Sequence, residues 1–245
     1  MKNIDENSIV GSIVADDYRM SSVFVKFGID FCCQGNRSIA ESCKAEDINM
    51  NEVIDALKQQ SENPTTTRTE DYESWSLDFL AQHIIQKHHK YVTTQIPILQ
   101  TLLAKIVQVH GALHPELKQI ENLFNISAGE FTMHMKKEEL MLFPFIRKMV
   151  ITKETNGELP IAHFGKIENP VHLMMQEHDG EGERFKEMAA LSNNFTPPID
   201  ACNTYRTTYK LLKEFEEDLH LHIHLENNIL FPKSIELEEE LSKNS

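Results

Sequence analysis

The chain has 245 residues, of which 40% are hydrophobic and 25% charged, a composition typical of a soluble globular protein. Its formal net charge of −14 would repel a nucleic-acid backbone, so we exclude nucleic acid as a partner. No apolar run approaches the roughly 18 residues needed to cross a bilayer, and we expect no membrane partner. The acidic N-terminus lacks a secretory signal, and two of the four cysteines are adjacent, which is not typical of a disulfide framework. We therefore expect a cytoplasmic protein with reduced thiols.

Residues 1–60 are predicted to form a small helical domain. Ser38, followed by Glu41 three residues later, indicates a capping box at the start of a short helix. The polar segment 61–74 is predicted to be a linker. A domain of this size has difficulty enclosing its own core. It could therefore pack on the rest of its own chain or on a second chain, which would make a homodimer.

Residues 75–245 show the periodicity of four long helices with short connections, which predicts an antiparallel four-helix bundle. No alternating strand pattern and no glycine-rich phosphate loop is present, so the fold class is all-α. Pro97 is expected to kink or break the first helix, whereas Pro144 and Pro232 are expected near the ends of the second and fourth. The expected helices cover residues 76–109, 115–149, 170–191 and 199–230.

One sequence motif occurs twice in this bundle. His134-x-x-x-Glu138, followed by Leu-Phe-Pro at 142–144, recurs 88 residues later as His222-x-x-x-Glu226, again followed by Leu-Phe-Pro. Residues four apart lie on one face of a helix, so each copy presents an imidazole and a carboxylate in the same direction. Two such faces turned toward each other would form a mixed nitrogen and oxygen site.

Each copy is preceded by a further histidine at matching distance. His89 lies 45 residues before the first copy and His178 lies 44 residues before the second. Four helices would then supply four His and two Glu, which suits a pair of iron or manganese ions better than Mg²⁺ or Ca²⁺. A paired zinc site would not need six ligands on four helices. The predicted metal ligands are His89, His134, Glu138, His178, His222 and Glu226.

Other polar residues near these positions are interpreted as lying outside the ligand set. His110 is left open as a residue behind the ligands or a weak extra ligand, and Glu130 and Glu177 are left open between lining the site and facing solvent. Helical periodicity places His83 and His88 at the surface. It places His220 and His224 either at the surface or behind the ligands.

The repeat, with His89 and His178 on the alternate helices, resembles a hemerythrin-like domain. Together with the N-terminal sequence Phe-Cys-Cys-Gln-Gly at 31–35, the chain resembles the iron–sulfur cluster repair di-iron proteins (the RIC family) over essentially its whole length. The resemblance implies two iron ions in a non-haem, oxo- and carboxylate-bridged centre, with Glu138 and Glu226 as bridges. It also implies a cytoplasmic stress protein that restores iron–sulfur clusters damaged by oxidative or nitrosative stress, with the damaged proteins as clients.

The adjacent Cys32 and Cys33 match the N-terminal motif of that family. A disulfide between adjacent residues is strained, so free thiols are expected, and they could accept iron, relay electrons or contact a client. Two small buried apolar residues are the alternative. Cys43 could join them, whereas Cys202 is interpreted as an ordinary core residue.

Three functions remain open at this point. The preferred one is iron donation from the centre to damaged clusters. The second is an enzyme that reduces NO to N₂O, with Cys32 and Cys33 supplying electrons. The third is a hemerythrin-like sensor or carrier that binds O₂ or NO.

Overall fold

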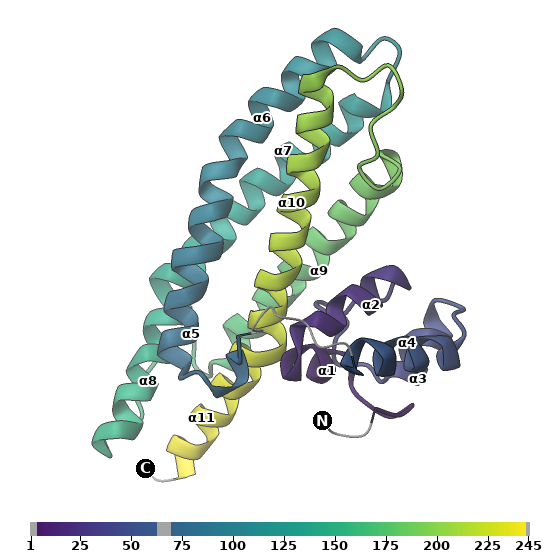
Figure 1. The fold of residues 1–245 in the computed structure, drawn as a ribbon. Helices are drawn as coiled ribbons and strands as arrows, with labels where there is room; N and C mark the ends of the chain where they lie inside the picture. Colours follow the sequence, from purple (N-terminus) through teal and green to yellow (C-terminus); the bar gives the residue numbers. More distant parts are fainter. Residues whose placement is uncertain (1–3, 63–69, 244–245) are drawn as a thin grey trace.

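The computed structural model describes residues 4–62 and 70–243, and every regular element within them is helical (Figure 1). The predicted all-α class is therefore confirmed. Residues 63–69 of the predicted linker lie outside the described part of the chain. None of the described helices combines the length and the apolar character that a membrane crossing requires.

Four long rods run side by side as the predicted bundle (Figure 1). The second rod packs against the first and third, and the fourth packs against the first. The rods are α5 (Leu77–Ile84) continued by α6 (Lys90–His110), α7 (Glu116–Lys137) continued by α8 (Phe143–Thr155), α9 (Glu168–Leu191), and α10 (Asn203–Leu225) continued by α11 (Phe231–Lys243).

Three of the rods contain a five-residue π-helical turn where their two segments meet. These turns are η3 (Ile85–His89), η4 (Glu138–Leu142) and η5 (Glu226–Leu230). Pro144 and Pro232 each follow a π turn by two residues. A proline has no N–H for the α-helical ladder, and a wide turn just before it accommodates the missing donor. The prediction that these prolines lie at helix ends is therefore wrong, because both rods continue for about three further turns.

Two other helix starts differ from the prediction. The third rod starts at Glu168, two residues before Pro170. The fourth starts at Asn203 because Cys202 has an extended backbone, with ψ at 172°, and Ile199 lies fully exposed in the preceding loop. Pro97 lies inside α6.

The N-terminal unit consists of short helices. Ser38 and Glu41 form the predicted capping box, since the Glu41 N–H donates to Ser38 Oγ at 3.2 Å and the Ser38 N–H donates to Glu41 Oε2 at 2.8 Å. Its elements are α1 (Val10–Asp16), η1 (Tyr18–Met20), α2 (Ser21–Lys26), α3 (Ile39–Ala45) and α4 (Met50–Glu62).

This unit packs against the bundle of its own chain, beside α9 and α10 (Figure 1). Phe24 and Phe31 belong to one continuous buried cluster with Phe215 of α10. The approach is close, because a Cβ atom at Gly11 or at Gly35 would lie 2.3 or 2.5 Å from the side chain of Asn228 in η5. The unit thus buries much of its apolar surface against the bundle of its own chain.

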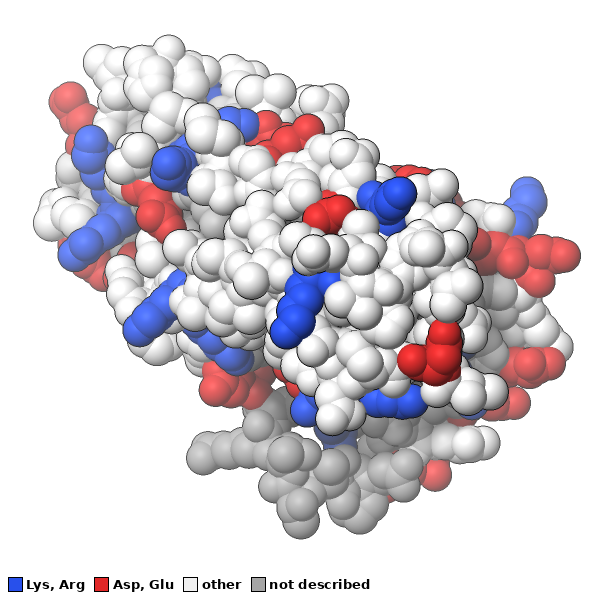
Figure 2. Space-filling model, turned by 90° about the horizontal axis from the view of Figure 1, so that it is seen from above, with Lys and Arg blue, Asp and Glu red and all other residues white. Residues whose placement is uncertain are grey.

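Charged side chains of both signs are interspersed on the face of the molecule shown in Figure 2. The net charge of −14 is therefore not gathered there into one acidic patch. A mixed surface of this kind is typical of a protein that stays dispersed in water rather than one that attracts a polyanion.

Candidate metal centre

The structure brings all six predicted ligands together at the π-turn end of the bundle. They form two groups that share both glutamates, and one donor atom of each residue lies within 4.8 Å of the others in its group. We call the first pair of histidines position A and the second pair position B. Position A is His89 and His222, and position B is His134 and His178, each with Glu138 and Glu226.

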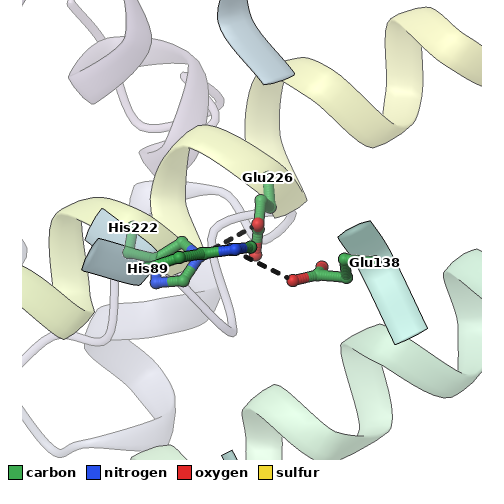
Figure 3. A group of neighbouring side chains, drawn as sticks. All are labelled: His89, Glu138, His222 and Glu226. Atoms are coloured by element: carbon green, nitrogen blue, oxygen red, sulfur yellow. Dashed lines mark hydrogen bonds and ion pairs between the residues drawn. The ribbon is translucent and has the colours of Figure 1, made fainter. Parts of the chain in front are cut away.

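Position A is drawn in Figure 3. His222 Nε2 lies 3.0 Å from Glu226 Oε1, and His89 Nε2 lies 3.4 Å from Glu138 Oε2. In position B, His134 Nε2 and His178 Nε2 are 3.0 Å apart. Two imidazole nitrogens at right angles on one ion, each about 2.1 Å from it as in zinc sites, would be about 3.0 Å apart. The spacing therefore fits a single metal ion held by both rings.

The π turns place these side chains. Both shared glutamates, Glu138 and Glu226, are the first residue of their π turn, and His89 is the last residue of η3. α-Helical spacing upstream keeps each motif histidine on the same face as its glutamate. Single π turns occur frequently at functional sites because they redirect side chains without breaking the rod.

Both glutamates are completely buried. Imidazole nitrogens approach them closely, yet Glu138 Oε1 and Oε2 and Glu226 Oε2 have no hydrogen bond within the described structure. Burying two carboxylates with so few hydrogen-bond donors is costly unless positive charge compensates them. The residues present therefore fit two bound cations, and both glutamates, which belong to both groups, could serve both of them.

The pKa shifts have the same physical origin. Burial opposes charge on His134, but attraction to Glu138 and a hydrogen bond with Glu177 raise the pKa of His134 to about 10. Burial also opposes charge on Glu226, yet His222 and His178 hold the pKa of Glu226 well below its usual range. The cluster thus stabilises positive charge in its centre, whether carried by protons or by metal ions.

Three of the four histidines use their outer nitrogen for a hydrogen bond. The acceptors are carboxylate or amide oxygens, so each Nδ1 donates a proton and each Nε2 faces the centre, where its lone pair would bind a metal ion once the nitrogen is deprotonated. The bonds are His89 Nδ1 to Glu139 Oε1 at 2.7 Å, His134 Nδ1 to Glu177 Oε2 at 2.8 Å, and His178 Nδ1 to Asn227 Oδ1 at 2.8 Å.

His88 is not at the surface, which corrects the sequence prediction. It is fully buried, its Nδ1 lies 2.9 Å from Asp218 Oδ1, and its ring stacks on His222 with centroids 5.4 Å apart. His88 and His89 are adjacent in η3, and His88 is buried because Asp218 and His222 of the fourth rod cover its face. α-Helical spacing alone would separate them by about 100°.

Three further histidines are more buried than expected because other elements cover their faces. His224 is buried under the N-terminal unit, 5.8 Å from the Phe31 ring, and His220 is half-buried beside the same ring. His83 is half-buried against Trp75. Periodicity identified the faces of His220 and His224 correctly but could not show that the N-terminal unit covers them.

The residues left open by the sequence fall into different places. Glu177 contacts the ligand His134 directly. Glu130 pairs instead with Arg184. His110 ends α6, 21 residues beyond His89 and therefore about 30 Å along the helix, so it cannot take part.

His110 instead lies 3.2 Å from the Sγ of Cys202, at the far end of the bundle. Cys202 is exposed, so its interpretation as a core residue is wrong. Hydrogen bonds from the backbone at the start of α10 and from His110 lower the pKa of Cys202 to about 7.

The two positions differ in what surrounds them. A pocket of about 500 Å³ opens beside position B, and its lining includes His134, Glu177, Lys137 and Glu130. Stacked rings do not distinguish the positions, since Phe143 packs on His89 and His88 on His222 in position A, while Phe131 packs on His134 and Phe231 on His178 in position B.

The cysteines of the N-terminal unit lie next to position B. Cys32 and Cys33 are free thiols, and Cys33 Sγ lies 3.5 Å from the backbone carbonyl oxygen of His178. Asp30 completes a group of three possible metal ligands with them. Cys43 is buried elsewhere in the unit and is not part of that group.

Two domain families match the chain. Residues 6–61 match ScdA_N, described as a domain of unknown function (DUF542), and residues 80–234 match the hemerythrin HHE cation binding domain.

Relatives match most of the chain. It is 30% identical over 217 residues (87% of this chain, 90% of the relative) to a "Probable iron-sulfur cluster repair protein" of Haemophilus influenzae. It is 30% identical over 230 residues (94% and 99%) to the "Iron-sulfur cluster repair protein ScdA" of Staphylococcus haemolyticus. It is 32% identical over 231 residues (94% and 97%) to the "Iron-sulfur cluster repair protein YtfE" of Yersinia pestis.

Proposed function

We propose that this chain, which belongs to the iron–sulfur cluster repair proteins with a hemerythrin HHE domain, repairs damaged iron–sulfur clusters by donating iron from a di-iron centre. The resemblance noted from the repeat and the adjacent cysteines is confirmed at the level of the family. The proposed clients are iron–sulfur proteins damaged by oxidative or nitrosative stress, and the proposed place of action is the cytoplasm.

The observation that carries the proposal is the pair of buried glutamates shared by four imidazoles, in which three of the four carboxylate oxygens have no hydrogen bond within the described residues. Four neutral imidazoles and two carboxylates supply one negative charge per metal position, less than a carboxylate-rich di-iron set supplies, which favours release of a ferrous ion. The proposed ligands are the six residues predicted from the sequence, with Glu138 and Glu226 shared by both positions. Bound iron would supply exchangeable ferrous ions and one-electron chemistry.

The surroundings of the centre favour donation from one position. His134 lies at the wall of the 500 Å³ pocket, so a ligand or a chelating client can approach position B. The lining of that pocket includes no histidine of position A, so we expect the ion in position A to be the one that stays. A centre that gives up one ion while its bundle remains folded meets the need of a repair protein.

The proposal is tested with anaerobically purified protein. Metal analysis and Mössbauer spectroscopy should find two coupled irons per chain. Incubation with a protein whose [4Fe–4S] cluster lacks iron should transfer one iron and leave one behind. Zinc, or a single uncoupled iron, would contradict the di-iron centre, and a rebuilt cluster with both irons retained would contradict donation.

A second candidate uses the same centre. The pocket beside position B is large enough to admit NO or O₂, so NO reduction or reversible binding of either gas are the alternatives. The reduced protein exposed to NO without oxygen separates them. Formation of N₂O above that of metal-free protein would support reduction, and a reversible complex without N₂O would support a sensor.

A further inference from the structure

We propose that Asp30, Cys32 and Cys33 form a second, thiolate-based metal site that receives a ferrous ion leaving position B. The inference rests on the proposed function, since it names the route by which the donated iron reaches the surface. The step is a ligand exchange without change of oxidation state. The ion leaves imidazole and carboxylate ligands and is taken by two sulfurs, which lose their protons to solvent.

The geometry of the two sulfurs suits one ion. Cys32 Sγ and Cys33 Sγ are 3.9 Å apart. Two sulfurs bound to one tetrahedral ion, each about 2.3 Å from it as in zinc sites, would be about 3.8 Å apart. Asp30 Oδ1 lies 3.3 Å from Cys32 Sγ, and one donor atom of each of the three residues lies within 4.8 Å of the others.

The loop that carries these donors is already fixed. Asp30 Oδ1 accepts the backbone N–H of Cys32 at 3.0 Å and that of Cys33 at 2.9 Å, a turn in which an aspartate orders the residues after it. A preordered loop costs less entropy when a metal binds. The three donors therefore do not have to be assembled by the ion.

Two contacts connect this loop to position B. Cys33 Sγ approaches the carbonyl oxygen of His178, and the helix one turn later has Gly182, where a Cβ atom would lie 3.3 Å from that sulfur. Asn227 bridges the two sites, since its Oδ1 accepts from His178 Nδ1 and its Nδ2 donates to the carbonyl of Cys32 at 3.3 Å. The loop thus touches a position B ligand from two sides.

The loop also faces outward. A second pocket, of about 260 Å³, lies between the N-terminal unit and the bundle, and Asp30 and Cys32 are part of its lining. Asp30 is exposed, so water or a client ligand can complete the coordination. Two thiolates and one carboxylate favour Fe²⁺, Zn²⁺ or Co²⁺ over Mg²⁺ and Ca²⁺. Among these, the donated ion is ferrous iron.

The site is tested with Co²⁺ added to full-length, iron-loaded protein under anaerobic conditions. We expect one further metal per chain and a sulfur-to-cobalt charge-transfer absorption, which the sulfur-free ligand set of positions A and B cannot produce. Cys32→Ser and Cys33→Ser should abolish the absorption, whereas Cys202→Ser, which removes an exposed thiol at the far end, should leave it unchanged. An unchanged absorption in both loop variants, or none in the wild type, would overturn the site.

Asp30→Asn supplies a test that does not depend on a buried cysteine. The asparagine oxygen can still accept both backbone N–H groups, so the loop should keep its shape while the charge is lost. We expect Co²⁺ to bind at least about tenfold more weakly, the lower end of the usual effect of supporting residues on metal affinity. Equal affinity would remove Asp30 from the site.

The route is tested separately by the rate at which iron passes to a ferrous chelator. Cys33→Ser should retain two irons per chain but release one of them more slowly than the wild type or Cys202→Ser. Release at the wild-type rate would overturn the route. Wild-type protein that binds Co²⁺ at the loop but never releases iron would instead contradict the proposed donation.

Discussion

Positions A and B have the same inner donors, two imidazoles and two shared carboxylates, but different surroundings. Position B lies between an open pocket, which His134 lines, and the cysteine loop, which contacts His178. The repeated motif makes the inner donors equivalent, and the stacked rings of Phe143 and Phe231 repeat with it. The pocket and the cysteine loop, which do not repeat, make the ion of position B the more accessible one.

The residue after each glutamate shows how the difference arises. Glu139 follows Glu138 and supports His89 with a carboxylate, whereas Asn227 follows Glu226 and supports His178 with an amide. A carboxylate acceptor makes an imidazole a stronger donor than an amide does. Asn227 has a second hydrogen-bonding group to spare and uses it on the cysteine loop. The change from glutamate in the first copy to asparagine in the second therefore weakens the hydrogen-bond support of the histidine. It also creates a hydrogen bond to the cysteine loop.

Removal of both irons should have the largest effect. Each iron at about 1,000 times its dissociation constant would stabilise the fold by about 4 kcal/mol, so the two together would contribute about 8 kcal/mol. For a chain of about this size that corresponds to a rise in Tm of roughly 16–32 °C. Calorimetry of holo and chelator-treated protein measures it. An unchanged Tm would mean that the buried glutamates are compensated without metal.

The comparison also predicts two steps in that removal. A mild chelator should take the iron of position B first, and the iron of position A should leave only under conditions that open the bundle. Iron analysis after gel filtration at each chelator concentration gives the stoichiometry. Loss of both irons in a single step would contradict the conclusion that position B is more accessible than position A.

Loss of a shared carboxylate should affect both positions at once. Glu138→Gln and Glu226→Gln each replace a bridging oxygen by an amide nitrogen, and we expect iron to fall from two per chain to one or fewer. Glu236→Gln, at an exposed glutamate of α11, is the matched control and should keep two irons. Full occupancy in both bridge variants would show that the glutamates are not shared ligands.

The sequence predicts well the inner donors that positions A and B have in common. Each motif histidine and its glutamate are four residues apart, so a helix alone brings them together, and an identical repeat implies an identical partner face. The fold follows from the same periodicity. The four rods and the capping box at Ser38 depend on local patterns of this kind, and the structure contains them.

The surroundings of the two positions depend on packing that no local sequence pattern predicts. His88 is buried because Asp218 and His222, more than 100 residues away in the sequence, lie against it. His224 is buried because the N-terminal unit lies over it. The exposure of Cys202 follows from the late start of α10. For both histidines the deciding contact comes from residues distant in the sequence.

The two supporting residues should act on different ions. Glu139→Ala removes the support of His89 in position A, and Asn227→Ala removes the support of His178 in position B. Loss of such a support typically weakens metal binding 10–100-fold. In stepwise chelation, the second iron should therefore leave Glu139→Ala at a lower chelator concentration than it leaves the wild type. In Asn227→Ala, the first iron should leave at a lower concentration.

Hydrogen exchange separates the two variants further. Asn227→Ala also removes the bond to the Cys32 carbonyl, so residues 31–33 should exchange faster, while Glu139→Ala should leave that loop unchanged. The assignment of Asn227 to position B and of Glu139 to position A is wrong if both variants ease the release of the same iron. It is also wrong if both variants speed exchange in the loop.

Glu177→Gln should have the smallest effect. The amide oxygen can still accept from His134 Nδ1, so only the charge is lost, and we expect iron in position B to bind less than about tenfold more weakly, below the usual range for lost supports. Glu130→Gln, on the wall of the same pocket but paired with Arg184, is the control and should not change the affinity.

The pH dependence decides whether the charge of Glu177 is the cause. The hydrogen bond from His134 lowers the pKa of Glu177 to about 2. A lowered carboxylate pKa means that the contribution is present above the unfolded value of about 4.3 and is lost only as the pH falls toward 2. The ratio of wild-type to Glu177→Gln affinity should therefore be the same at pH 5.5 and pH 8. A ratio that approached one at pH 5.5 would show that Glu177 titrates normally and that its contact with His134 contributes little to position B.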